Sequence, residues 1–331
     1  MASRRKFITT TGVGILGTSV FSGLNVSGRN IFVEETEQKK NIVIGIIGAE
    51  NNHTVGYGKL FNIEKKFPGA ELKYVWGETD AFALRAQKEG AIPNIVKDPR
   101  EMLGKIDALI VDHRHPKNHL PAAMPFLEEK IPMFIDKPFC YRAEEGLDFL
   151  RKAKALGVLV SSYSSVAQTN ATFDIRNQVK EIKDIERIVR YGVLYMGMDN
   201  KYGGVFYYGI HTIQPLTYIF GEDITEVKMT ESGGNWTASI AFGNGVMATL
   251  IFTEKYHGWN TFIVVKEGVR ELKSRVSETD PPRNYVDMVE MFQTGKMPRS
   301  FQSILNGVSV LESLEKSVFS RKWEEVKYVK I

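Results

Sequence analysis

Short apolar runs alternate with amphipathic segments between Asn41 and about Ser165. The amphipathic segments carry apolar residues at helical spacing near 55–66, 80–89, 120–129 and 143–156. The apolar runs are NIVIGIIG, ELKYVW, IDALIVD, IPMFIDKPF and GVLVSSYS. Strands that alternate with helices are typical of a parallel sheet with helices on both faces. The pattern therefore predicts an α/β fold that opens with a doubly wound Rossmann domain over residues 41–165.

The pattern changes after Ser165, where β-rich runs follow one another without helices between them. The runs are IERIVRYGVLYMG, ITEVKMTES, WTASIAF, VMATLIFTE and NTFIVVKEG. Glycine turns at 233–234 and 243–245 have the composition of hairpin loops. Residues 166–280 are predicted to form an α+β domain with a large, mostly antiparallel open sheet. Helices expected at 284–294 and 301–317 and the strand candidate EEVKYVKI make residues 281–331 a segment that packs back on both domains.

Residues 1–29 have the layout of an export signal rather than of a domain. Arg4, Arg5 and Lys6 precede an apolar stretch diluted by Gly, Ser and Thr, and residues 3–8 resemble a twin-arginine signal. A membrane-spanning helix needs about 20 predominantly apolar residues, which this stretch lacks. We expect export by the twin-arginine machinery to the periplasm or a similar compartment, without a permanent anchor, and a linker over residues 30–40.

Charge and cysteine content exclude several classes of partner. The chain has 43 basic and 39 acidic residues, and four of the basic ones lie before Glu34, so the exported part has 39 of each. A nucleic-acid partner requires a basic surface, which this balance does not provide. Cys140 is the single cysteine, so an internal disulfide and a thiolate metal cluster are excluded.

The turn after the first predicted strand, IIGAENNHTVGYG, departs from the dinucleotide fingerprint G-x-G-x-x-G. Gly48 stands at the first glycine, but Glu50 replaces the second and His53 replaces the third. A carboxylate beside a pyrophosphate would repel it, so Glu50 must turn away or bind another group. Backbone amides at the start of a helix can still hold phosphate. The candidate phosphate-binding residues are Gly48, Ala49, Asn51, Asn52 and His53.

An acidic residue that binds the adenosine ribose is expected at the end of the second strand. Here the sequence reads Trp76-Gly77-Glu78, so Glu78 is the candidate, one position along. Glu78 in this role slightly favours NAD over NADP. A surface glutamate at the start of a helix is the alternative interpretation.

Two residues have the chemistry of a reaction centre. Lys137, in Asp136-Lys137-Pro138, ends the fifth parallel strand, where open α/β sheets bind ligands, and its ammonium can stabilise a developing alkoxide. His211 lies near the start of a segment with helical spacing, and a histidine can transfer a hydroxyl proton near neutral pH. The alternatives are a surface lysine in a turn and a structural histidine beside an apolar helix face.

Together these features resemble the Gfo/Idh/MocA family, named for glucose-fructose oxidoreductase and inositol dehydrogenase. Asp136-Lys137-Pro138 is similar to the family's Glu-Lys-Pro motif, GGVFYYGIHTIQPLTYIFG to its Gly-Gly motif with the catalytic histidine, and FQTGKMP to the start of its closing helix. The resemblance implies that Lys137 holds the substrate hydroxyl and that His211 moves its proton while hydride passes to or from NAD or NADP. It also implies a homo-oligomer, a dimer or a tetramer.

The chain departs from the family near the histidine as well. Members commonly carry Asp four residues before it and three residues after it, where this chain has Tyr207 and Gln214. Tyr207 is the candidate third catalytic residue, and Asp136, His115 and His119 are candidate cofactor contacts. Aromatic and polar side chains that would bind a sugar or polyol are expected in the same cleft. The candidate substrate ligands are Arg114, Tyr195, Asp199, Tyr202, Tyr208 and Gln214.

Two other classes of function compete with the oxidoreductase. Glu50, Tyr207 and Gln214 favour an exported carbohydrate-binding protein that has kept the fold without redox activity. His113, His115 and His119 suggest a metal-dependent sugar lyase or hydrolase, because alternate residues at a strand end share one face. No second set of ligands accompanies these histidines, so substrate or cofactor contact is favoured and no metal site is assigned.

Overall fold

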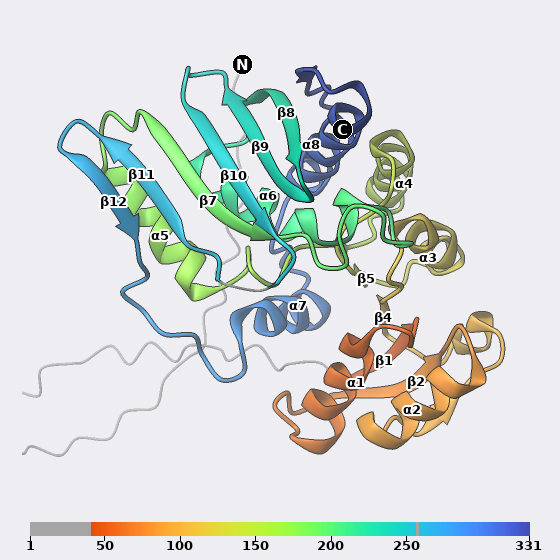
Figure 1. Cartoon of the computed structure of the whole chain (residues 1–331). Helices are drawn as coiled ribbons and strands as arrows, with labels where there is room; N and C mark the ends of the chain where they lie inside the picture. Colours follow the sequence, from red (N-terminus) through yellow and green to blue (C-terminus); the bar gives the residue numbers. More distant parts are fainter. Residues whose placement is uncertain (1–40, 256–257) are drawn as a thin grey trace, which may run out of the picture. The chain divides into compact units, whose positions relative to one another are not determined.

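A computed structural model describes residues 41–255 and 258–331, which contain two sheets. The first is parallel and has the strand order β3-β2-β1-β4-β5-β6 (Figure 1). Its strands are β1 (Ile42–Ile47), β2 (Ala70–Trp76), β3 (Asn94–Ile95), β4 (Ala108–Val111), β5 (Met133–Ile135) and β6 (Val160–Ser161). The order reverses between β1 and β4, so the carboxyl ends of these two strands form the switch point where such folds bind ligands.

The helices of this first domain occupy the predicted segments with small shifts. They are α1 (Asn52–Gly58), α2 (Asp80–Gly90), α3 (His119–Glu128) and α4 (Ala143–Leu156). The segment predicted as one helix at 55–66 begins earlier, because Asn51 caps α1 through its side chain, and it continues as a π-helical stretch, Lys59–Ile63. Short 3-10 turns lie at Pro99–Met102 and Pro116–Asn118.

The second sheet has seven strands in the order β12-β11-β7-β10-β9-β8-β13. Its pairs are antiparallel except β7 with β10, which confirms the mostly antiparallel sheet. The strands are β7 (Arg187–Val193), β8 (Ile224–Ser232), β9 (Asn235–Phe242), β10 (Met247–Thr253), β11 (Thr261–Val265), β12 (Gly268–Leu272) and β13 (Glu324–Glu325). The glycine turns at 233–234 and 243–245 join β8 to β9 and β9 to β10, as hairpins.

Four helices accompany the second sheet. They are α5 (Asn170–Glu181), α6 (Val205–Phe220), α7 (Arg283–Thr294) and α8 (Phe301–Ser320). Figure 1 shows α5, α6 and α8 along one face of this sheet, and α6 packs on both β7 and α8. The sequence pattern missed α5, whose helical face packs only partly buried residues. It also placed the start of α6 too late, so that His211 lies in the second turn of that helix.

Two apolar clusters hold the domains together. One is shared by the two sheets and includes Leu109, Ile188, Ile240 and Leu311. The other lies on the opposite side of the parallel sheet and takes in Met288 and other residues of α7. The carboxyl-terminal helices therefore pack on the first domain as well as on the second, although β13 is much shorter than the predicted final strand.

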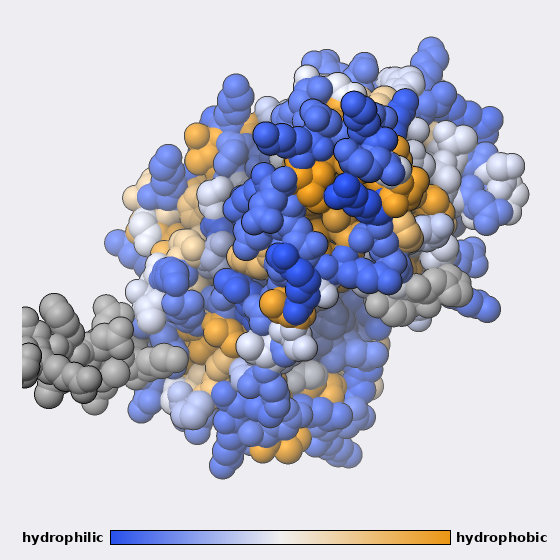
Figure 2. Space-filling view, turned by 90° about the vertical axis from the view of Figure 1, so that its left-hand side faces the viewer, coloured by the Kyte–Doolittle hydropathy of each residue, from blue (hydrophilic) through white to orange (hydrophobic). Residues whose placement is uncertain are grey.

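The surface is mixed in character. Figure 2 shows polar residues across much of one face, with apolar patches between them, which is an ordinary distribution for a folded domain. In the part of the chain that the structure describes, no helix combines the length and apolar character needed to cross a membrane. The predicted export signal lies outside the described residues.

Candidate functional site

Lys137 and His211 come from different domains and lie against the same tyrosine ring. The Lys137 Nζ is 5.5 Å from the centroid of the Tyr208 ring, and the His211 ring centroid is 5.0 Å from it. Lys137 follows β5 and His211 lies on α6, and both side chains are buried. The domain interface therefore brings a cationic group and an imidazole to one place, although 74 residues separate them in the sequence.

His211 is oriented by two residues, of which sequence reasoning missed one. Its Nδ1 lies 2.7 Å from Ser164 Oγ, and the Ser164 backbone amide donates to Gln214 Oε1 at 2.6 Å. Gln214, a predicted substrate ligand, therefore fixes the segment that holds Ser164. The only sequence signal for Ser164 is its place just beyond the sixth parallel strand. Ser164 and Gln214 together hold the His211 imidazole in place.

Burial controls the protonation of His211. Burial lowers the pKa of His211 well below its ordinary value, and the positive charge of Lys137 lowers it further. Asp136 opposes this shift, but it is the smaller effect. The imidazole is therefore neutral at physiological pH and can accept a proton.

Tyrosines surround the reactive pair. The ring centroid of Tyr207 lies 4.8 Å from that of Tyr202 and 5.2 Å from that of Tyr208, and the ring centroid of Tyr195 lies 5.4 Å from that of Tyr208. Arg114 lies over the Tyr202 ring at 5.3 Å, so five of the predicted catalytic and substrate residues form one cluster. Burial raises the pKa of Tyr207 to about 12, so its hydroxyl stays protonated. Tyr207 can therefore donate a hydrogen bond, but it does not replace a carboxylate base.

The turn at 48–53 keeps the backbone approach of a dinucleotide loop. Gly48 has a φ of +103°, and a Cβ added there would lie 2.7 Å from the backbone carbon of Asp112. The turn is thus pressed against the end of β4, which requires glycine. Asn51 caps α1 through the His53 amide, and Asn52 is exposed at the first position of that helix.

The amides of this turn already hold an anion, which is the carboxylate of Glu78. The Ala49 and Glu50 amides both donate to Glu78 Oε2 at 2.8 Å, and His113 Nδ1 lies 2.8 Å from Glu78 Oε1. Partial burial alone would raise the pKa of Glu78, but the contact with His113 and the two amides lowers it to about 2. Glu78 is therefore ionised at neutral pH and bound to the turn, rather than free at the edge of the crevice.

Glu50 points away from the turn amides, as electrostatic repulsion from a pyrophosphate would require. Its carboxylate accepts a hydrogen bond from the Tyr202 hydroxyl at 2.6 Å and pairs with Lys201 Nζ at 3.4 Å. The residue that replaces the second fingerprint glycine thus links the first domain to the loop before α6. The expectation that Glu50 binds another group is confirmed.

These contacts test whether the turn fits a dinucleotide. The close approach at Gly48 and the two amides directed at one carboxylate are the features that a pyrophosphate uses. The Glu50 side chain does not obstruct these two amides. The Glu78 carboxylate occupies them, so the turn fits a dinucleotide once this carboxylate has moved away from the amides.

The three histidines after β4 do not converge on a common point. His113 faces Glu78, whereas His115 accepts a hydrogen bond from the Lys117 amide. Buried His119 lies between carbonyl groups, with Nε2 2.8 Å from the oxygen of His113 and Nδ1 2.9 Å from that of Pro138. The alternative prediction of a metal centre made of these three histidines is therefore wrong, because each ring has a different hydrogen-bond partner. His119 is a structural residue and no contact to a cofactor follows from its position.

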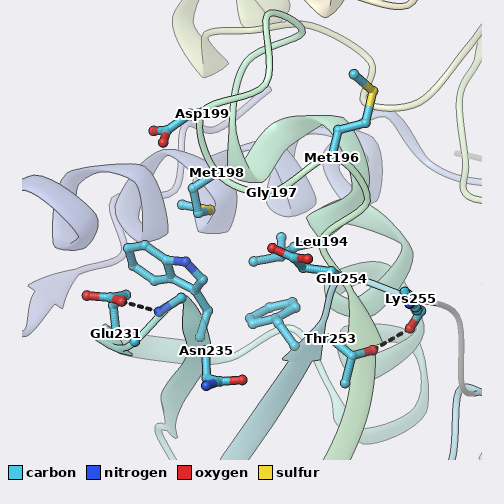
Figure 3. A pocket seen from close by; sticks show the side chains of 14 residues that line it. Leu194, Met196, Gly197, Met198, Asp199, Glu231, Asn235, Thr253, Glu254 and Lys255 are labelled. Carbon is cyan, nitrogen blue, oxygen red and sulfur yellow. Dashed lines mark hydrogen bonds between the residues drawn. The ribbon is translucent and has the colours of Figure 1, made fainter.

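A large cavity lies apart from this cluster. It has a volume of about 800 Å³ and is bordered by Leu194, Trp236 and Phe252 at one end of the second sheet. Figure 3 shows Asp199 at its rim with Met196 and Met198 on the same loop. Asp199 therefore borders this groove, and it is the one predicted site residue that does. A smaller cavity of about 50 Å³ adjoins Lys137.

Comparisons with known proteins agree with this architecture. Residues 42–164 match the family model GFO_IDH_MocA, described as an oxidoreductase family with an NAD-binding Rossmann fold. No curated protein matches the chain.

Solved structures match over most of the chain. The apo scyllo-inositol dehydrogenase of Lactobacillus casei has 16% identity and a TM-score of 0.74, with 87% of this chain and 99% of that chain covered. The myo-inositol dehydrogenase of the same organism, in complex with NAD(H) and myo-inositol, has 12% identity and a TM-score of 0.74, with 88% and 98% covered. GenD2 from gentamicin A biosynthesis, in complex with NAD, has 12% identity and a TM-score of 0.73, with 92% and 100% covered.

Identities this low establish the fold alone. The match to the family model spans residues 42–164, which form the Rossmann domain. This domain is therefore similar in sequence to the GFO_IDH_MocA oxidoreductase family.

Proposed function

We propose that the protein is a nicotinamide-dependent oxidoreductase acting on a sugar or polyol, with NAD favoured over NADP. The observation that carries the proposal is the meeting of Lys137 and neutral His211 against Tyr208, at the carboxyl edge of a Rossmann sheet. The likeness in fold to enzymes solved with NAD(H) and inositols supports the substrate class.

The bound nicotinamide would supply the hydride acceptor or donor, and Gly48, Ala49 and Asn51 would hold its phosphates once Glu78 has moved. This chain's own residues handle the hydroxyl group. Lys137 would donate a hydrogen bond to the substrate oxygen and stabilise the negative charge that grows on it. His211 would take the proton of the same hydroxyl.

His211 can act as a base only in one tautomer. Its Nδ1 must carry the hydrogen and donate it to Ser164 Oγ, which leaves Nε2 free to accept the proton. Among the described residues Nε2 has no hydrogen bond. Ser164, held by Gln214, would therefore select the tautomer that catalysis requires.

Substrate recognition would use the tyrosine cluster and Arg114. Tyr195 is half exposed and Tyr208 lies between the reactive groups, so both rings can pack on the carbon face of a sugar. The Arg114 guanidinium, which lies 3.4 Å from the Tyr202 hydroxyl, can bind hydroxyl groups at the rim.

The first test asks whether the purified protein carries or binds a nicotinamide nucleotide. The protein is denatured, and the supernatant is examined for released NAD and NADP by absorbance and mass spectrometry. Native protein supplied with NAD or NADP is then assayed with a panel of inositols and sugars. Reduction of NAD with at least one polyol, lost in Lys137→Met, would support the proposal. A protein that neither carries nor binds either nucleotide would refute it.

The second candidate is a carbohydrate-binding protein without redox activity. Glu78 favours it, because its carboxylate occupies the amides that a pyrophosphate needs. Binding of an inositol or sugar to a protein that has no affinity for NAD or NADP would support this function instead.

We further propose export through the twin-arginine route and a homo-oligomeric state. The route carries folded proteins, so a cofactor bound in the cytoplasm would accompany the protein. A tightly held cofactor that is recycled within one catalytic cycle would suit a compartment that supplies little free NAD. Cell fractionation and the mass of the purified assembly test these points.

A further inference from the structure

Four polar side chains next to the turn form a compact group that takes no part in the proposed proton transfer from the substrate hydroxyl. His53 lies on α1, Asp112 follows β4, Asp136 follows β5, and Asn51 caps α1. His53 Nδ1 is 3.6 Å from Asp112 Oδ1 and 3.5 Å from Asp136 Oδ2. Three elements thus direct two carboxylates and an imidazole at one point.

Asn51 completes this group as a fourth member. Its Nδ2 is 3.1 Å from Asp112 Oδ1, 3.3 Å from Asp136 Oδ2 and 3.1 Å from His53 Nδ1. An amide can present its oxygen from nearly the same place as its nitrogen. Turning it over gives up the Nδ2 hydrogen bonds to Asp112 and Asp136 and the long 3.3 Å bond from the His53 amide, and metal–ligand bonds would replace the contacts to the two carboxylates. The four atoms are then one nitrogen and three oxygens at the corners of a small tetrahedron.

The dimensions of this tetrahedron match metal coordination. A tetrahedral zinc site with metal–ligand distances of about 2.0–2.2 Å has ligand atoms about 3.3–3.6 Å apart. Five of the six separations here lie between 3.1 and 3.6 Å. Among the residues that the structure describes, His53, Asp112 and Asp136 are the group of histidine and acidic side chains with this spacing.

Charge and space point to a cation as well. The side chains of Asp112 and Asp136 are 0% and 6% exposed, and buried carboxylates require a neutralising partner. Lys137 Nζ, 3.9 Å from Asp136 Oδ2, and His53 between the two carboxylates offset part of this charge, and a cation at the centre of the group would offset it more directly. The 50 Å³ cavity is lined by both His53 and Asp136, and it can hold a water as a further ligand.

We propose that His53, Asp112 and Asp136, with the amide oxygen of Asn51 turned inward, bind a divalent cation. One imidazole and three oxygens suit Zn²⁺ or Mn²⁺, whereas soft metals prefer sulfur ligands. The cation would offset two negative charges that otherwise lie beside the phosphate-binding turn. Metal titration requires no nicotinamide, so the site can be tested whether or not the proposed oxidoreductase function holds.

The test uses the purified full-length protein with its affinity tag removed and with metal stripped by EDTA. Zn²⁺ and Mn²⁺ are titrated by calorimetry, and Co²⁺ by its visible absorption, which is intense in a tetrahedral site. One equivalent per chain is expected. His53→Gln and Asp112→Asn should each weaken binding at least about 100-fold, since losing a residue that only orients a ligand already costs about 10–100-fold.

Two further variants make the test specific. Asn51→Asp replaces the neutral ligand by a carboxylate and should tighten binding. His115→Gln removes a histidine outside the group and should leave binding unchanged. His53 is 46% exposed, so His53→Gln should fold even if Asp112→Asn does not. A folded wild-type protein that binds none of the three metals, or binding that survives His53→Gln, would overturn the proposal.

Discussion

The turn at 48–53 and the face formed by Lys137 and His211 differ in how far their polar groups are hydrogen-bonded within the protein. At the turn, Glu78 occupies two amides, Glu50 binds Tyr202 and Lys201, and Asn51 binds two carboxylates. At the other face, neither Lys137 Nζ nor His211 Nε2 has a hydrogen bond among the described residues. The polar groups of the turn are therefore satisfied within the protein, whereas the nitrogens of Lys137 and His211 remain available to a ligand.

This difference has a physical cause. A buried polar group costs free energy unless it finds a partner, so groups without one are retained where a ligand completes them. The turn has replaced two fingerprint glycines by Glu50 and His53, and each new side chain has found a partner within the protein.

Replacing Lys137 by methionine should lower kcat on the best polyol by about 10²–10⁴-fold, because the growing charge on the substrate oxygen loses its hydrogen-bond donor. His211→Asn should have an effect of similar size. Steady-state kinetics with NAD measures both. Lys152→Met, which removes a surface lysine paired with Glu128, is the control and should behave like the wild type. An unchanged kcat in Lys137→Met would show that Lys137 has no role in the reaction.

Replacing Glu78 by glutamine should lower the free energy of unfolding by about 2 kcal/mol at pH 7, because two amides and His113 lose a charged partner. The folded-state pKa of about 2 lies below the ordinary value of 4.5. The stabilisation by Glu78 is therefore present above pH 4.5 and is lost as the pH falls from 4.5 to 2.

Urea unfolding at several pH values measures this dependence. The part of the acid destabilisation that comes from Glu78 should be absent in Glu78→Gln. Glu71→Gln, at a surface pair with Lys73, is the matched control and should keep the wild-type profile. Equal profiles for Glu78→Gln and the wild type would mean that the carboxylate does not stabilise the turn.

Replacing Glu50 by glutamine should tighten NAD binding by about fivefold, since a negative charge next to the phosphates is worth about 1 kcal/mol in a well-hydrated site. Fluorescence titration with NAD measures the change, and Glu64→Gln, an exposed position after α1, is the control. Weaker binding in Glu50→Gln would show instead that its contact with Tyr202 helps to shape the cofactor site.

Replacing Tyr202 by phenylalanine should have the smallest effect, at most about 1 kcal/mol in the free energy of unfolding. It removes the hydroxyl that donates to Glu50 at 2.6 Å and leaves the ring on Tyr207 and Arg114 in place. Thermal unfolding measures it. In a Glu50→Gln background the same substitution should cost less, because the charged partner is gone. A cost that does not change would mean that the two side chains are not coupled.

Much of the architecture follows from local patterns. Alternation of apolar runs and helical segments predicts a parallel sheet, and the glycine turns at 233–234 and 243–245 predict hairpins, because these features depend on residues close in sequence. Asp136-Lys137-Pro138 points to Lys137 for the same reason. The helix α5 was missed, because it buries little and most of its residues are polar.

Local sequence patterns are enough to predict the two-sheet plan, the departure from the glycine fingerprint and the need for Glu50 to turn away. The final positions of these side chains depend on the three-dimensional packing. It placed Glu78 on the Ala49 and Glu50 amides, Ser164 on His211, and His53 against Asp112 and Asp136, while it separated His113, His115 and His119. Each of these contacts joins elements far apart in the chain, and their distances depend on how the sheets and helices pack, which no local pattern records.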